Sequence, residues 1–304
     1  MAPARPRHAR RRPRRLPVAL GLARAARGTP GDRGRSRYRR RPVRAVVDSE
    51  WLAAHLGEDD LVVGDVRGPN AHMRGHIPGS RPLVLGSPPP AADEESARAL
   101  AHEIALRLRR HGITGRERLV LVDRGDGVGA MPAAQMAELA GHPWVAILLG
   151  GMAEWKGELE EGAVELEPVR EAEADLEPNP PALPTRQELA GRLGDPSLVL
   201  LDVRTPDEFT GRRGNQCDPR QGHVPGARNL EVGELFVAPG QPAPPERIRE
   251  LVGLPEGAEI VAYCHSGSRS ALATLALRTA GYDARNYAGS WHEWSRHDEL
   301  PLER

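Results

Sequence analysis

The chain has 304 residues, enough for two ordinary domains, and 39% of them are hydrophobic, which is sufficient for packed cores. Its two cysteines exclude a disulfide framework and are typical of a reducing compartment, so we expect a cytoplasmic protein. No run of 18 apolar residues is present, so we expect no membrane span. The net charge of zero hides an asymmetry, because residues 1–44 hold 16 arginines and one acid, Asp32.

Residues 1–44 are rich in Arg, Pro and Gly and lack a long apolar periodicity, which predicts a disordered tail. Two other interpretations stay open. The arginines could bind nucleic acid electrostatically, or the arginine pairs before the apolar run 16–22 could belong to a targeting peptide. That run is short and is soon broken by Arg24 and Arg27, so we favour the plain extension. From the folded part of the chain we expect no nucleic-acid binding.

The rest of the chain repeats one succession of elements, which indicates an internal duplication. In each copy a short helical pattern precedes an apolar strand that ends in Asp-Val-Arg, at 65–67 and at 202–204. A Gly-His-Ile/Val-Pro-Gly motif follows, and then a helix, a second apolar strand, a loop and another helix. Both copies end on Gly-x-x-x-Glu-Trp, at 150–155 and at 289–294.

Strands that alternate with helices predict an α/β fold, with one parallel sheet flanked by helices in each copy. The stretch 162–185 has five prolines among many glutamates and indicates a solvated, semi-rigid linker. We therefore divide the chain into a tail at 1–44, a first domain at 45–161, the linker at 162–185 and a second domain at 186–304.

The second apolar strand of copy two ends on Cys264, and a Gly/Ser loop with Arg269 leads into a helix that begins near Ser270. This order places a thiol at a helix N-terminus, where backbone N–H groups stabilise a thiolate and bind an anion beside it. The matching position in copy one is Asp123. A carboxylate cannot carry a transferable sulfur atom, so the chemistry is predicted in copy two.

With these motifs in this order, residues 45–304 resemble tandem rhodanese domains, and the chain resembles the two-domain thiosulfate/3-mercaptopyruvate sulfurtransferases. The resemblance implies that the first domain is catalytically inactive and covers one side of the active site. It also implies that the Cys264 thiolate takes the outer sulfur of a donor, releases sulfite if the donor is thiosulfate, and passes the sulfur from a persulfide to cyanide or a thiol. Related phosphatases have Cys-x5-Arg, whereas four residues separate Cys264 from Arg269, which favours sulfur transfer.

The predicted catalytic residue is Cys264. Backbone N–H groups and side chains of the following loop are predicted to hold the persulfide and the donor. These substrate-binding candidates are His265, Ser266, Gly267, Ser268, Arg269 and Ser270. The insertion at 211–220 adds Arg212, Arg213 and Arg220, since the resemblance implies that arginines of this segment hold the anionic end of the donor.

The donor itself is less strongly indicated. The loop departs both from the Cys-Gly-Ser-Gly-Val-Thr of mercaptopyruvate enzymes and from the Cys-Arg-x-Gly-x-Thr/Arg of thiosulfate enzymes. Because His265 and Arg269 bring positive charge, we favour thiosulfate, a dianion. The alternatives are a 3-mercaptopyruvate sulfurtransferase and a persulfide-relay carrier that receives its sulfur from a partner. An intact Cys264 loop argues against a non-catalytic regulatory module. We expect a monomer whose partners are a small anionic sulfur donor and a cyanide or thiol acceptor.

The remaining conspicuous residues are interpreted structurally. Cys217 is taken as an incidental thiol, and whether it pairs with Cys264 cannot be judged without geometry. The histidines and aspartates of the paired motifs are expected to orient turns and strand ends; they are Asp65, His76, Asp202 and His223. The glycine run at 125–129 lacks the dinucleotide spacing, and His292-Glu293 with His297 lacks the spacing of a zinc-protease motif, so we predict no cofactor and no metal.

Overall fold

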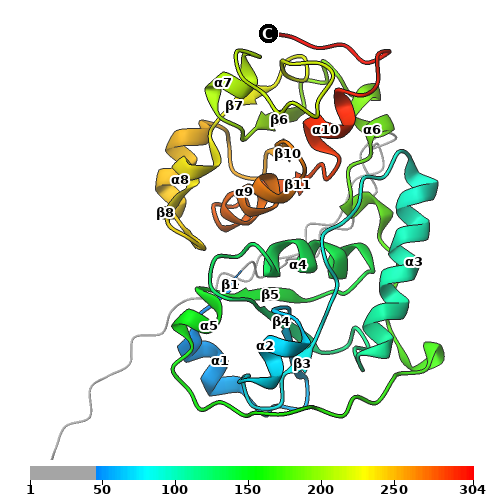
Figure 1. Cartoon of the computed structure of the whole chain (residues 1–304), viewed down its shortest axis with the longest axis vertical. Helices are drawn as coiled ribbons and strands as arrows, with labels where there is room; N and C mark the ends of the chain where they lie inside the picture. The colour runs from blue at the N-terminus through cyan, green and yellow to red at the C-terminus, as the bar shows by residue number, and fades with distance from the viewer. Residues whose placement is uncertain (1–45) are drawn as a thin grey trace, which may run out of the picture. The chain divides into compact units, whose positions relative to one another are not determined.

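The computed structural model describes residues 46–304, and the predicted tail at 1–44 lies outside the described residues. Two parallel sheets organise the described part of the chain (Figure 1). One has the strand order β1-β5-β4-β2-β3 and the other has the order β11-β10-β6-β7. The expected parallel α/β architecture of two tandem units is therefore confirmed. No helix of residues 46–304 is long and apolar enough to cross a membrane.

The first unit contains the five-stranded sheet. Its strands are β1 (Val46–Val47), β2 (Leu61–Asp65), β3 (Arg81–Pro82), β4 (Arg118–Val122) and β5 (Val145–Leu148). Its helices are α1 (Ser49–His55), α2 (Pro69–Met73), α3 (Glu94–Arg110), α4 (Ala130–Leu139) and α5 (Gly151–Glu154). Every strand pair in this sheet is parallel.

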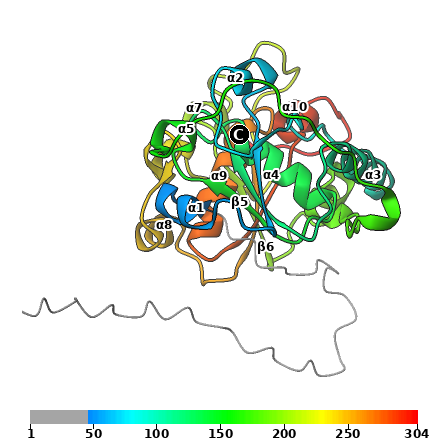
Figure 2. The ribbon, with the colours of Figure 1, turned by 90° about the horizontal axis from the view of Figure 1, so that it is seen from below.

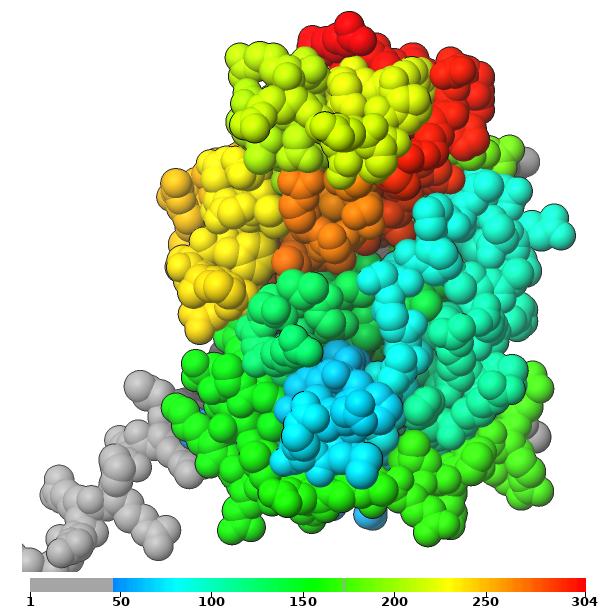
Figure 3. Space-filling model, in the orientation of Figure 1, coloured from blue at the N-terminus to red at the C-terminus, as the bar shows by residue number. Residues whose placement is uncertain are grey.

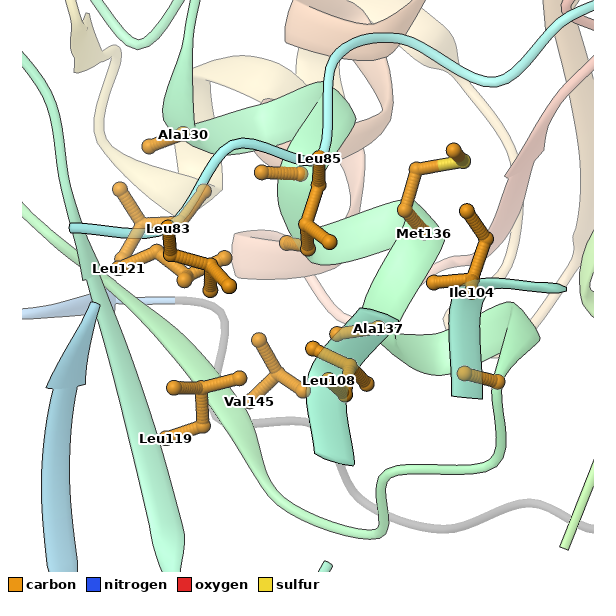
Figure 4. Packing of buried hydrophobic residues seen from close by; sticks show 14 of the residues in the cluster. Leu83, Leu85, Ile104, Leu108, Leu119, Leu121, Ala130, Met136, Ala137 and Val145 are labelled. Atoms are coloured by element: carbon orange, nitrogen blue, oxygen red, sulfur yellow. The ribbon is translucent and has the colours of Figure 1, made fainter. Parts of the chain in front are cut away.

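Helices cover both faces of the first sheet, which explains why its central strands are continuous apolar runs. Along β4 the side chains alternate between the faces. Leu119 and Leu121 pack in the cluster that includes α3 and α4, as Figure 4 shows. Val120 and Val122 belong to a second cluster with Leu52 of α1.

The second unit contains the four-stranded sheet and a small antiparallel ribbon. Its strands are β6 (Leu198–Asp202), β7 (Arg228–Asn229), β8 (Phe236–Ala238), β9 (Gln241–Pro242), β10 (Glu259–Tyr263) and β11 (Asp283–Asn286). Its α-helices are α6 (Arg186–Gly191), α7 (Pro206–Phe209), α8 (Pro245–Val252), α9 (Ser268–Thr279) and α10 (Ser290–Trp294). The same alternation holds for β10, where Ile260 packs with α9 and Val261 packs with the tryptophans of α10.

The segment 162–185 contains two 3-10 turns, η1 (Glu171–Glu173) and η2 (Pro180–Ala182), and no α-helix or strand. It follows the surface of the first unit and is tied to it by main-chain bonds. The N–H of Val169 donates to the Arg109 carbonyl at 2.9 Å, and that of Asn179 donates to the Leu139 carbonyl at 2.8 Å. These contacts give a physical basis for the stiffness expected of a proline-rich linker.

The two units meet through α4 and α9, which lie side by side in Figures 1 and 2. Met131 and Ala134 of α4 share one buried cluster with Leu275 of α9. A mostly buried ion pair, Arg278 with Glu138 at 2.7 Å, crosses the same boundary. Figure 3 shows the orange atoms of the α9 region directly against the green atoms of the first unit. Since α9 is the helix that follows Cys264, the first unit fixes the helix that carries the candidate site.

Candidate active site

Cys264 lies directly after β10, a strand that is paired with β6 on one side and with β11 on the other. The carboxyl ends of parallel strands are where α/β sheets place their ligand sites. Residues 265–267 turn away from the strand, and α9 begins at Ser268. The helix predicted to begin near Ser270 is therefore present and starts two residues earlier.

The sulfur of Cys264 is surrounded by hydrogen-bond donors. The backbone N–H of Gly267 lies 3.1 Å from Sγ and the Ser270 hydroxyl lies at 3.4 Å. The Ser290 hydroxyl lies at 3.9 Å, but it donates to the Tyr287 carbonyl at 2.8 Å. Cys264 itself is only 1% exposed. Cys264 also belongs to the apolar cluster of the second unit, but donors aimed at its sulfur stabilise negative charge on it, which an inert structural thiol does not need. This arrangement suits a thiolate or a persulfide anion.

Two strained or crowded backbone positions hold this loop. Gly267 has φ of +88°, and a Cβ there would lie 2.6 Å from the carbonyl oxygen of Ala288, so only glycine fits without displacing the loop. Ser290 has φ of +53° and is the one non-glycine residue with positive φ within 46–304. Its hydroxyl accepts from the Cys264 N–H at 3.1 Å and donates to the Tyr287 carbonyl at 2.8 Å, which compensates for the strain.

Arg269, a predicted donor-binding residue, is paired with a carboxylate. Its two terminal nitrogens donate to the two oxygens of Glu208 at 2.8 Å each. Burial alone would raise the pKa of Glu208, but hydrogen bonds from Arg269 and Thr205 lower it to about 2. The pKa of Arg269 is raised by Glu208 and, less strongly, by Cys264, so the guanidinium lies near the sulfur with its charge largely balanced.

The other loop residues take different positions. Ser270 is buried and reaches the sulfur, while Ser266 and Ser268 are exposed at the loop surface. His265 turns toward the insertion, where its Nε2 lies 3.1 Å from a carboxylate oxygen of Asp218. Their predicted roles in donor binding stay predictions.

The three insertion arginines are not brought together at Cys264. Arg212 is exposed and pairs with Asp207 at 2.8 Å, and Arg213 is also exposed. The guanidinium of Arg220 donates to four main-chain carbonyls of the C-terminal segment. These acceptors are Ser295 at 2.9 Å, Leu300 at 2.8 Å, Trp294 at 2.9 Å and His297. In this arrangement Arg220 fastens the C-terminal segment, and a donor contact would require exchange of those bonds.

The corresponding loop of the first copy is longer and surrounds a carboxylate, with α4 beginning at Ala130. Asp123 is buried, and one of its oxygens accepts from the Gly125 N–H at 2.9 Å. The other oxygen accepts from the N–H groups of Gly129 and Ala130, both at 3.1 Å. A carboxylate held by three backbone N–H groups carries no transferable sulfur, which supports the expectation that the first copy is inactive.

The paired motifs have structural contacts in both copies. Arg204 is buried, donates to Asp202 at 2.6 Å and to the Gly222 carbonyl at 2.7 Å, and lies 4.9 Å from the ring centroid of Trp291. Arg67 repeats the first two contacts with Asp65 and Gly75, both at 2.6 Å. The Asp-Val-Arg motif therefore fastens the Gly-His motif to the end of the first strand.

Sequence reasoning missed three contributors to this site. Glu208 is marked in the sequence only as the last residue of a Thr-Pro-Asp-Glu capping box, which predicts a helix start and not a partner 61 residues away. Ser290 gave no signal. Asn286 donates to the Gly267 carbonyl at 3.1 Å and to Gln135 of the first unit at 3.0 Å. Through this contact the first unit reaches the cysteine loop.

Comparisons with known proteins agree with this geometry. The model of the rhodanese-like domain family matches residues 48–158 and 185–297. A probable 3-mercaptopyruvate sulfurtransferase of Pseudomonas aeruginosa is 32% identical over 280 residues, which cover 84% of this chain and 97% of that protein. A thiosulfate sulfurtransferase of Azotobacter vinelandii is 29% identical over 274 residues, 85% of this chain and 96% of that protein. A crystal structure of a probable thiosulfate sulfurtransferase is 36% identical, with a TM-score of 0.65, and covers 82% of this chain and 99% of its own.

Proposed function

Since the chain belongs to the rhodanese family and is a sulfurtransferase, we propose that it moves the outer sulfur of thiosulfate, through a persulfide on Cys264, to cyanide or a thiol. The observation that carries the proposal is the position of the Cys264 sulfur, beside the N–H of Gly267 and the hydroxyls of Ser270 and Ser290. These groups suit a reaction in which an anionic sulfur is present before and after each step.

The first half of the cycle forms the persulfide. The Cys264 thiolate attacks the outer sulfur of thiosulfate, a new S–S bond forms, and the old S–S bond breaks so that its electron pair leaves with sulfite. The charge stays at −3, as one thiolate and one dianion become one persulfide anion and one dianion. No proton is transferred in this step, so the site needs charge-stabilising donors and not a general base.

The second half returns the thiolate. Cyanide attacks the terminal sulfur of the persulfide, and the bonding pair of the S–S bond returns to Cys264, giving thiocyanate. A thiol acceptor takes the same sulfur after it loses its own proton. Because donor and acceptor react in turn with one sulfur atom, ping-pong kinetics are expected.

The choice of thiosulfate over 3-mercaptopyruvate is supported by access to the sulfur. Cys264 is 1% exposed, which favours the smaller donor. Arg220 is occupied by carbonyls and Arg212 is paired with Asp207, so neither is free to hold the anionic end of either donor. The charge of Arg269 is a weaker support than the sequence indicated, because Glu208 balances it. Relatives named for each donor match at similar identity, so 3-mercaptopyruvate is the competing donor.

The experiment is steady-state formation of thiocyanate from cyanide, with the two donors assayed side by side. We expect a kcat/KM for thiosulfate at least about tenfold above that for 3-mercaptopyruvate, a difference of about 1.4 kcal/mol. Cys264→Ser should abolish turnover, and Cys217→Ser should retain it as the matched control.

Other outcomes assign other functions. A preference for 3-mercaptopyruvate would refute the donor assignment and leave the persulfide mechanism in place. Full activity of Cys264→Ser would refute the mechanism itself. A protein that turns over neither donor, yet accepts sulfur on Cys264 from another persulfide, would be a relay carrier.

A further inference from the structure

Four potential metal ligands converge beside the cysteine loop. Cys217 and Asp218 come from the insertion before the Gly-His motif, His265 comes from the residue after Cys264, and His292 comes from α10. One ligand atom from each residue lies within 4.8 Å of all the others. Cys217 lies 48 residues before His265 and 75 residues before His292. Three separate segments thus bring one sulfur, two imidazoles and one carboxylate to a single point.

The two sulfur–nitrogen distances in this cluster are those of a tetrahedral shell, and the remaining pairs lie within 4.8 Å. The Cys217 sulfur lies 3.7 Å from Nε2 of His265 and 3.6 Å from Nδ1 of His292. With Zn–S of about 2.3 Å and Zn–N of about 2.0–2.1 Å, tetrahedral angles place sulfur and nitrogen about 3.6 Å apart. The planes of the two imidazole rings meet at 74°. The rings are therefore not stacked face to face, and their packing does not exclude an ion.

Asp218 supplies a second, independent observation. Its side chain is 1% exposed, and within residues 46–304 its buried Oδ2 has no well-aligned hydrogen bond, although Nε2 of His265 lies nearby. This oxygen lies 3.1 Å from Nε2 of His265 and is directed at the cluster. When His265 presents Nε2 as a lone pair, as a metal ligand must, this buried oxygen has no donor, which is costly unless a cation satisfies it.

The other oxygen of Asp218 is already satisfied. Oδ1 accepts from Arg296 at 3.2 Å, and the guanidinium of Arg296 also donates to the Cys217 carbonyl at 2.6 Å. Nδ1 of His292 lies 2.9 Å from the same oxygen, and on binding a cation this nitrogen would exchange that contact for the ion. Arg296 therefore orients the Asp218 carboxylate through Oδ1 and leaves Oδ2 available to an ion. Outer-shell partners of metal-ligating side chains commonly act in this way. Its charge opposes a cation, but a Cys217 thiolate and Asp218 together supply two negative charges against it.

We propose that Cys217, Asp218, His265 and His292 form a Zn²⁺ site that ties the insertion to the cysteine loop and α10. The donor set of one thiolate, two imidazoles and one carboxylate is one that Zn²⁺ prefers and that Mg²⁺ and Ca²⁺ do not. Binding needs neutral imidazoles and releases the thiol proton of Cys217, with no change of oxidation state. This inference goes beyond sulfur transfer, and it departs from the sequence expectation of no metal and of an incidental Cys217.

The test uses the chain's own cysteine pair. The full-length protein, after treatment with a chelator, is titrated with Co²⁺ and then with Zn²⁺ against a chromophoric chelator. Because the chain has only two cysteines, the Cys264→Ser protein has Cys217 as its single thiol. We expect this variant to show a thiolate-to-cobalt charge-transfer band and tetrahedral d–d bands, and to bind one Zn²⁺ per chain.

Cys217→Ser should lose the charge-transfer band and weaken zinc binding at least about hundredfold, since even the loss of a group behind a ligand costs 10–100-fold. His292→Gln should weaken it similarly, and His102→Gln, an exposed histidine of α3, should not. Circular dichroism checks that each variant is folded. Absence of the band in Cys264→Ser, or equal zinc affinity of Cys217→Ser and the unmodified protein, would overturn the proposal. Neither readout depends on sulfur-transfer activity.

Discussion

Replacing Glu208 with glutamine tests how the charge of Arg269 is balanced beside the nucleophile. The side chain of Glu208 is mostly buried, and its pKa is lowered from 4.5 to about 2 against the opposing effect of burial. A shift of that size corresponds to about 3 kcal/mol of folding free energy at pH 7. Since glutamine still accepts one hydrogen bond from Arg269, we expect Glu208→Gln to lower the free energy of unfolding by about 1–3 kcal/mol.

The pH dependence of this effect has a defined sign. A carboxyl whose folded pKa is depressed contributes stability that is fully present above its unfolded pKa, here 4.5, and is lost as the pH falls through its folded pKa, here about 2. The full contribution should therefore fall from about 3 kcal/mol at pH 7 to about 2 kcal/mol at pH 3.5. Urea unfolding of both proteins at the two pH values measures this difference.

Although Glu208→Gln should destabilise the fold, it should lower the KM for thiosulfate. Without Glu208, Arg269 keeps its full charge near Cys264, and an extra interaction of about 1 kcal/mol with a dianion lowers the KM for thiosulfate about fivefold. Asp207→Asn is the matched control, because this neighbouring carboxylate pairs with the exposed Arg212 instead. A raised KM in Glu208→Gln, with an unchanged KM in Asp207→Asn, would show that Glu208 positions Arg269 for the donor and would refute the charge-balance argument.

Two further substitutions separate positioning from donor binding. Gly267→Ala should lower the kcat of sulfur transfer more than about tenfold and destabilise the fold by about 1–3 kcal/mol, because its Cβ would lie 2.6 Å from a carbonyl oxygen at positive φ. The control is Gly253→Ala, where φ is +63° and no atom lies within 4 Å of the added Cβ. This variant should lower the free energy of unfolding by about 1–2 kcal/mol and leave kcat unchanged. Equal losses of kcat in the two variants would disprove the steric argument. Arg220→Met should lower the free energy of unfolding by about 2–4 kcal/mol, since four carbonyls lose their donor, and should leave the KM for thiosulfate within about twofold. A tenfold rise in KM with unchanged stability would instead restore Arg220 to the donor site.

The elements that the sequence predicted well are those with a strong local pattern. The apolar run that became β10, the turn after Cys264 and the start of α9 depend on neighbouring residues, and each lies within about two positions of its expected place. The edge strands β1, β3 and β7 have two residues each, which is too short for any periodicity to indicate them.

The parts of the site that could not be predicted depend on contacts between distant segments. Arg269 was expected to face the donor, but its partner Glu208 stands 61 residues earlier in a segment that looks like an ordinary helix start. Arg220 was expected near the donor, and the carbonyls that occupy it lie 74–80 residues further along the chain. Arginine marks a position where charge is useful, but the sequence does not say whether a ligand or the protein's own backbone uses it.

The two copies differ at the residue that ends the second apolar strand, which is Asp123 in the first copy and Cys264 in the second. A turn that directs backbone N–H groups inward needs an anion, because buried donors without an acceptor are costly. In the first copy the Asp123 carboxylate meets that need with its own two oxygens. In the second copy the Gly267 N–H points at the Cys264 sulfur, the atom that we propose gains and loses a second sulfur. On the proposed mechanism the loop stabilises an anion in both copies, and the thiolate in place of a carboxylate confines sulfur transfer to the second copy.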